Sequence, residues 1–255
     1  MSGHPHAWQR FEAAAPNDLW QLDFKGHFAL AAGRCHPLHV LDDHARFVVG
    51  LVACADERGG PVHDALTVIF RRYGLPWALL CDNGPPWGTL GAESRLTAVG
   101  AWLIRLGIQL VHGRPYHPQT QGKLERANRT LAADVVAIAR YPDLPSCQRA
   151  FDTWRHSYNH ERPHEALALA TPVTRYAPSV RPFPETLPPL VSEEGDEVRT
   201  VHADGEISLR GCAVAVSKAL VGQVVGVRPT TVDGVWEVRY AHPHVRTIDL
   251  RTAQA

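Results

Sequence analysis

The segment PWALLCDNGPPWG, residues 76–88, places an aspartate directly after a short apolar run and before a turn. The apolar run at 77–80 has the length of a buried strand. Asn83, Gly84 and the prolines that follow cannot continue a strand or a helix. Asp82 is therefore predicted to lie at the end of a buried strand, beside a loop, where a rigid element holds its carboxylate open to ligands.

The segments before this strand have the pattern of antiparallel strands. Residues 19–26, LWQLDFKG, alternate in polarity, and Asp23 lies opposite the face that carries the aromatic side chains. Two further apolar runs, at 38–41 and 47–53, are joined by a short polar turn, as in a hairpin. We therefore predict three antiparallel strands.

After the hairpin, helices are predicted to alternate with strands. Apolar residues recur at helical spacing in 61–74 and 98–107, and each of these segments ends at or just before a glycine. Short apolar runs at 76–81 and 108–113 follow them. This order predicts a mixed sheet covered by helices, with ligand chemistry at the strand ends where loops converge.

A longer helix is predicted over 120–140, with a carboxylate in its first turn. Its apolar stripe consists of Leu124, Leu131, Val135 and Ile138. At 100° per residue, Glu125 lies on the shoulder of that stripe. Another helix is predicted at 146–159.

The chain has 255 residues, of which 45% are hydrophobic and 20% are charged, as is ordinary for a globular protein. Lys plus Arg and Asp plus Glu both number 26, which excludes a uniformly basic nucleic-acid binder. The five cysteines form no C-x-x-C pair. No segment reaches the roughly 18 apolar residues of a membrane span, so we predict a cytoplasmic protein with no membrane partner.

Composition divides the chain into four parts. Residues 1–18 are predicted to be a leader or linker, and 19–180 an α/β domain. Residues 181–197 are rich in proline and then acidic, as in a linker. Residues 198–255 contain short alternating strands with Asp-Gly turns, which predict a small all-β barrel.

Three acids of the α/β part, Asp23, Asp82 and Glu125, are candidates for metal binding. Each alone is typical of a solvated or capping residue. Together they fit the preference of Mg²⁺ for a few carboxylates while water and phosphate oxygens fill its other positions. Two such ions about 4 Å apart can stabilise both the attacking and the leaving oxygen of a phosphoryl transfer.

Four segments carry a family resemblance: LWQLDFKG, CDNGPPWG, RPYHPQTQGKLERANRTL, and YNHERPHEAL with TP shortly after it. Together they resemble the integrase-core transposases of bacterial insertion sequences, which are relatives of retroviral integrases. The resemblance covers nearly the whole chain. It implies a ribonuclease H-like fold whose triad, Asp23, Asp82 and Glu125, binds two Mg²⁺ or Mn²⁺ ions, followed by a small SH3-like barrel.

The chemistry implied by this family is cleavage of DNA ends by water, followed by attack of the freed 3′-hydroxyl on target DNA. The partners implied are double-stranded DNA, both element ends and target, and further copies of the chain on that DNA. No small-molecule substrate is expected.

Basic residues near Glu125 supply candidates for contacts with DNA phosphates. These basic candidates are Arg114, Lys123, Arg126 and Arg129. Further candidates for DNA contact are His117 and Gln119, which match the family's HPQTQG, and Arg162. By charge alone, a solvated helix face with an ion pair between Glu125 and Arg129 explains the pattern equally well. A zinc site at His160 and His164 is disfavoured because Pro163 interrupts the helix that such a site needs.

Two departures from the family keep alternatives open. The family's helix-turn-helix region would precede residue 8, and the stretch between Asp82 and Glu125 is longer than in retroviral integrases. We therefore expect either a transposase catalytic core or a catalytically silent remnant of a truncated transposase that binds DNA or oligomerises. A structure-specific nuclease of the same fold is a third possibility.

Overall fold

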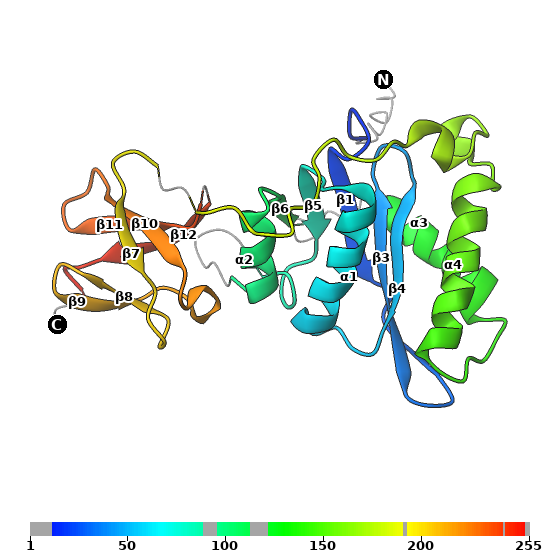
Figure 1. The fold of residues 1–255 in the computed structure, drawn as a ribbon, viewed down its shortest axis with the longest axis horizontal. Coiled ribbons are helices and arrows are strands. Elements are labelled where there is room, and N and C mark those ends of the chain that lie inside the picture. The colour runs from blue at the N-terminus through cyan, green and yellow to red at the C-terminus, as the bar shows by residue number, and fades with distance from the viewer. Residues whose placement is uncertain (1–11, 89–95, 113–121, 191–192, 242, 253–255) are drawn as a thin grey trace, which may run out of the picture.

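The computed structural model describes residues 12–252, with gaps at 89–95, 113–121, 191–192 and 242. Figure 1 shows a larger part that contains a sheet and helices, a smaller part that contains strands and a short 3-10 helix, Lys218–Leu220, and an extended segment between them. In the part of the chain that is described, no helix combines the length and the apolar character that crossing a membrane requires.

The larger part is built on a mixed sheet. Its strands are β1 (Leu19–Phe24), β2 (Phe28–Ala29), β3 (Arg34–Asp42), β4 (Val48–Cys54), β5 (Ala78–Cys81) and β6 (Gln109–His112). Strand β3 is antiparallel to β1, β2 and β4, while β5 is parallel to both β1 and β6. The predicted antiparallel strands and the later strands thus form one sheet.

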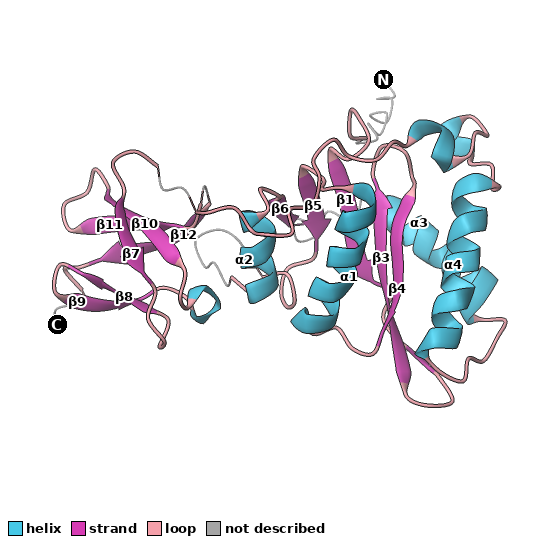
Figure 2. Cartoon of the chain, viewed as in Figure 1, coloured by secondary structure: helices cyan, strands magenta, loops and turns pink. Residues whose placement is uncertain are grey.

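Four helices cover the two faces of this sheet. They are α1 (Gly59–Tyr73), α2 (Ala98–Arg105), α3 (Gly122–Leu131) and α4 (Leu144–His160). Figure 2 shows α1 and α4 on opposite sides of β3 and β4. Alternation along β1 explains this: Trp20 and Leu22 pack in the cluster that contains α1 and α2, while Gln21 contacts the α3 side. The predicted ribonuclease H-like mixed sheet flanked by helices is confirmed.

The helix predicted over 120–140 differs from the observed one at its C-terminal end. Helix α3 stops at Leu131, and the chain continues in a wider π-helical turn, Ala132–Val136, in which the Ala137 N–H donates to the Ala132 carbonyl. The extra residue in this turn rotates the following side chains away from the stripe. Ile138 is consequently 74% exposed, and its prediction as a buried residue is wrong.

Helix α4 begins at Leu144, slightly earlier than predicted, because Asp143 caps it. The Asp143 carboxylate accepts a hydrogen bond from the Ser146 N–H at 2.8 Å, which satisfies one of the free amides of the first turn. Phe151 of this helix is fully buried against the sheet.

The smaller part is all β, as predicted. Its strands are β7 (Glu197–Thr200), β8 (Glu206–Leu209), β9 (Cys212–Ala215), β10 (Val224–Pro229), β11 (Val235–Arg239) and β12 (His244–Asp249). They form a four-stranded antiparallel sheet, β12-β11-β10-β7, and the hairpin β8-β9. Trp236 and Tyr240 lie in its core.

The segment between the two parts, residues 176–190, packs along the larger one. Arg181 donates hydrogen bonds to the carbonyls of Pro76, Leu106 and Gly107, and Phe183 lies against Phe70. Figure 1 shows this segment running beside α1 and α2 toward the smaller part. The proline-rich stretch is therefore an extended strap held by the sheet domain.

Candidate active site

Asp23 and Asp82 lie side by side at the carboxyl ends of two parallel strands. Gln21 of β1 is paired with Leu80 of β5, and the same register continued by two residues brings Asp23 level with Asp82. Because side chains alternate along a strand, both acids lie on the sheet face that Gln21 shares. Asp23 is partly buried, and Asp82 is exposed.

The electrostatics of this pair favour a bound cation. Burial and the neighbouring Asp82 carboxylate raise the pKa of Asp23 from 3.8 to about 6. Glu57 adds a smaller effect in the same direction. Two carboxylates at one strand edge repel each other when both are ionised, and a divalent cation between them removes that repulsion.

The loop after Asp82 folds tightly around a glycine. Gly84 has a φ of 113°, a conformation that side chains disfavour, and its N–H and carbonyl both bond to Gly88. Trp87 of this loop is buried and stacks on Phe24 at 6.3 Å between ring centroids. Gly84 therefore closes the turn, and Trp87 anchors the loop to β1 beside Asp23.

On the other side of Asp23, a buried histidine joins β3 to α3. His39 is directly opposite Asp23 in the register of β1 and β3. Its Nδ1 lies 2.7 Å from the Oδ1 of Asn128, and burial lowers its pKa to about 4. The ring is thus neutral and donates to Asn128. The sequence gave no sign that His39 links β3 to α3, because a lone histidine in an apolar run is typical of a core residue.

Glu125 occupies the first turn of α3 and is exposed. The turn is attached to β1, because the Leu124 N–H donates to the Gln21 side-chain oxygen at 3.2 Å. The sequence candidates Arg114, His117 and Gln119 lie outside the described residues.

Two of the three predicted metal ligands, Asp23 and Asp82, fit a hard divalent cation. Asp23 and Asp82 supply two neighbouring carboxylates, which Mg²⁺ and Mn²⁺ prefer. Across the described ranges, no three His, Cys, Asp or Glu side chains are gathered closely enough to hold a metal. Glu125 is therefore not assembled with the two aspartates in this structure.

The basic candidates have different surroundings. Lys123 is only 11% exposed, and its ammonium lies 2.6 Å from the Asp43 carboxylate. Lys123 is thus held in the protein interior by this ion pair, and no DNA contact is proposed for it. Arg126 and Arg162 are exposed and pair with Glu165 and Asp134.

Arg129 is exposed in the last turn of α3. Within the described part of the chain, it does not form the ion pair with Glu125 that was the alternative explanation of the charge pattern. Arg126, Arg129 and Arg162 thus remain on the surface.

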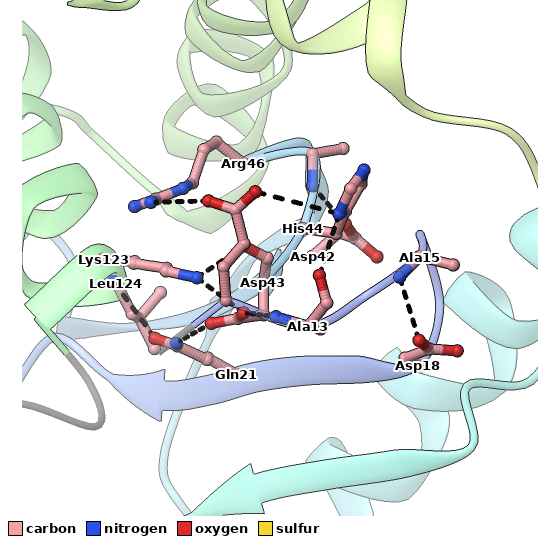
Figure 3. Close-up of polar contacts among 12 residues, drawn as sticks. Ala13, Ala15, Asp18, Gln21, Asp42, Asp43, His44, Arg46, Lys123 and Leu124 are labelled. Atoms are coloured by element: carbon pink, nitrogen blue, oxygen red, sulfur yellow. Dashed lines mark hydrogen bonds and ion pairs between the residues drawn. The ribbon is translucent and has the colours of Figure 1, made fainter. Parts of the chain in front are cut away.

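A buried polar cluster lies next to the site. Asp43, in the turn between β3 and β4, is fully buried and accepts hydrogen bonds from Ala13, Gln21 and Lys123 (Figure 3). The adjacent Asp42 accepts from the Ala45 N–H at 2.7 Å. The sequence interpretation treated these acids as a simple hairpin turn. Two consecutive acids between two strongly apolar strands were the available signal.

Known family patterns match both parts of the chain. Two family patterns described as integrase core domain match residues 13–118 and 106–172. A third, described as IS481 family transposase, C-terminal domain, matches residues 196–255.

Curated relatives occur in bacterial insertion elements. The uncharacterized 31.7 kDa protein of insertion element IS407 from Burkholderia multivorans is 27% identical over 158 residues, covering 62% of this chain and 54% of that protein. The uncharacterized 39.2 kDa protein of insertion element IS476 from Xanthomonas euvesicatoria is 27% identical over 160 residues, covering 63% and 44%. The chain thus spans about half the length of these relatives.

Two solved structures share the fold. A chain of the simian T-cell lymphotropic virus intasome in complex with PP2A regulatory subunit B56 gamma aligns with a TM-score of 0.54 and 18% identity, covering 94% of this chain and 82% of that chain. The HTLV-2 integrase catalytic core domain in complex with magnesium aligns with a TM-score of 0.50 and 18% identity, covering 65% and 100%.

Proposed function

We propose that this chain, which matches an integrase core domain followed by the C-terminal domain of the IS481 family transposases, is a divalent-metal-dependent DNA transposase. Its reaction is cleavage of DNA ends by water, followed by attack of the freed 3′-hydroxyl on a phosphodiester of target DNA, which joins the two strands and releases a 3′-hydroxyl of the target. The observation that carries this proposal is the Asp23–Asp82 pair, level at the ends of two parallel strands.

In this proposal Asp23 and Asp82 hold Mg²⁺ or Mn²⁺ together with Glu125. The ion, when bound, polarises the phosphodiester and the attacking oxygen. The chain's own contribution is to keep two carboxylates at fixed strand ends, where they can share a cation with phosphate oxygens. The first turn of α3 supplies Glu125 from the same face of the sheet, and two ions are expected.

DNA contacts are proposed for exposed arginines near Glu125. Arg126 and Arg129 lie on α3 with Glu125, and Arg162 follows α4. Their guanidinium groups suit phosphate oxygens, which would displace Glu165 from Arg126 and Asp134 from Arg162. The partners proposed are double-stranded DNA, as element ends and as target, and further copies of the chain on that DNA.

The test is a strand-cleavage and joining assay on branched DNA with Mn²⁺. Asp82→Asn and Glu125→Gln keep the shape of the side chains but remove a ligand charge, so we expect each to lower strand joining by roughly a hundredfold or more. DNA affinity should change little, because neither residue contacts phosphate directly. Asp64→Asn, an exposed acid on α1, is the matched control and should remain active.

Strand joining that survives in Asp82→Asn or Glu125→Gln contradicts the metal-ligand assignment. A folded wild-type chain that binds DNA in a salt-dependent manner but neither cuts nor joins it contradicts the proposed activity and indicates a silent DNA-binding remnant. Cleavage without any joined product indicates a nuclease of the same fold.

A further inference from the structure

Asp43 is a fully buried carboxylate that ties three distant segments together. Its Oδ2 accepts hydrogen bonds from the Ala13 N–H at 2.7 Å and from the Lys123 ammonium at 2.6 Å. Its Oδ1 accepts from the Gln21 side-chain amide at 2.6 Å. Figure 3 shows these groups converging on Asp43 from β1, from α3 and from the segment before β1.

Lys123 is held at two points of the same residue. Its ammonium donates to the Asp43 carbonyl oxygen at 2.9 Å as well as to the carboxylate. Apolar residues of similar volume often stabilise a fold as well as a buried ion pair does. We therefore interpret this ion pair as a contact that fixes the position of the first turn of α3, which carries Lys123.

Gln21 connects the same carboxylate to the backbone of α3. Its side-chain nitrogen donates to Asp43, and its side-chain oxygen accepts from the Leu124 N–H. The first amides of a helix have no acceptor within the helix, so this contact sets where α3 begins against β1. Gln21 lies two residues before Asp23, and Leu124 directly precedes Glu125.

A third contact holds α3 one turn further along. Asn128 bonds to His39, which is opposite Asp23 on β3. The contacts at Lys123, Leu124 and Asn128 thus bracket Glu125 on both sides. The first leads to Asp43 in the β3–β4 turn, and the other two lead to Gln21 on β1 and His39 on β3.

We propose that Gln21 and the Asp43–Lys123 ion pair are positioning residues, which fix the first turn of α3 against β1, on the sheet face that Asp23 and Asp82 share, so that the Glu125 side chain can turn toward a metal bound there. This inference rests on the proposed function, since it gives these residues a role in metal binding. They act through Glu125 and touch neither the metal nor DNA.

The test compares Asp43→Asn/Lys123→Met with the wild type. The double variant removes both charges together, so that no buried charge is left without a partner. The control is Arg71→Met/Glu185→Gln, which removes an ion pair with the same 2.6 Å separation from the exposed surface. Mn²⁺ affinity is measured by electron paramagnetic resonance, and binding that is lost in Asp82→Asn defines the site. Hydrogen exchange of the α3 amides is followed without metal.

We expect the double variant to bind Mn²⁺ about tenfold more weakly and to exchange the first amides of α3 at least about tenfold faster. The control should match the wild type in both measurements. If the double variant fails to fold, Gln21→Met, which keeps the ion pair and removes the hydrogen bonds of Gln21 to Asp43 and Leu124, carries the same expectations.

Wild-type affinity and exchange in a folded double variant would overturn the positioning role, while the proposed function would stand because the wild type still binds Mn²⁺. Faster exchange with unchanged affinity would also overturn it, because the contacts would then be structural alone. A wild-type chain that binds no Mn²⁺ would overturn the proposed function, and the positioning role with it.

Discussion

At the scale of single residues, Asp23 is held in an environment that disfavours its charged form. The side chain is partly buried on a sheet strand, and Asp82 lies beside it at the end of the next strand. Both effects raise its pKa to about 6. The folded protein is therefore more stable when Asp23 is protonated. A carboxylate that destabilises the folded state in this way is typical of a ligand-binding site.

Replacing Asp23 should therefore stabilise the protein at high pH. Between about pH 4 and 6 the folded state holds a proton that the unfolded state releases, so the free energy of unfolding falls as the pH rises through this window. Above pH 6 the stabilising proton is lost. Because the side chain is partly open to solvent, we expect Asp23→Asn to be more stable by roughly 1 to 2 kcal/mol at pH 8 and about equal at pH 4.

Urea unfolding from pH 4 to pH 8 without divalent ions measures this difference. Asp42, whose pKa burial also raises to about 6, is present in both proteins, so the difference between them isolates Asp23. A variant that is no more stable than the wild type at pH 8 contradicts the environment described for Asp23.

At the scale of elements, α4 satisfies the outer edge of β4 with two amide side chains. Asn159 accepts from the Val48 N–H at 2.8 Å and donates to the Val48 carbonyl at 2.9 Å. Gln148 bonds in the same way to the Ala53 N–H and the Leu51 carbonyl. The helix rises about 16 Å between Gln148 and Asn159, which matches the length of β4 between Val48 and Ala53. The helix thus covers an edge that could otherwise pair with another chain.

Asn159→Leu should destabilise the fold by roughly 1 to 3 kcal/mol, because both backbone groups of Val48 are then buried without a partner. Urea denaturation at pH 7 measures the change. Thr153→Ala, on an exposed position of the same helix, is the control and should stay within about 0.5 kcal/mol of the wild type. Equal losses in both variants would mean that Asn159 has no special role at this edge.

At the scale of the whole molecule, the strap links the sheet domain to the all-β part. Arg181 bonds to three carbonyls of the sheet domain and lies over the Trp77 ring at 4.3 Å. Arg105 of α2 continues the contact, donating to the Pro188 carbonyl in the strap and to Gln223 in the all-β part. The two parts are therefore connected by packed side chains as well as by the chain itself.

Arg181→Ala should loosen the strap and lower stability by roughly 2 kcal/mol, since three carbonyls lose a charged donor. We expect proteolysis between residues 176 and 190 to become several-fold faster. Limited digestion with mass spectrometry locates the cuts, and Arg140→Ala, at an exposed position, is the control. An unchanged digestion pattern would show that the strap is held by its apolar contacts alone.

Local patterns in the sequence predict the order of the main strands and helices, the mixed sheet and the all-β part, but not the two-residue strand β2. These features follow from local patterns: alternation along β1, helical spacing in α1 and α2, and turn residues such as Gly84. Asp82 was found at the end of a strand for the same reason. The limit of this reasoning appears at Ile138, because a π-helical turn changes the spacing without any sign in the pattern.

Contacts between side chains that are far apart in the sequence depend on the tertiary structure. Lys123 has the sequence signature of a phosphate contact, yet it is buried against Asp43, and Asn159 caps a strand that lies more than a hundred residues earlier. The level position of Asp23 and Asp82 likewise depends on the register of two strands that are separated by a hairpin and a helix. Such contacts depend on how helices and strands pack against one another. Local sequence patterns do not predict this packing, because the contacting residues are far apart in the sequence.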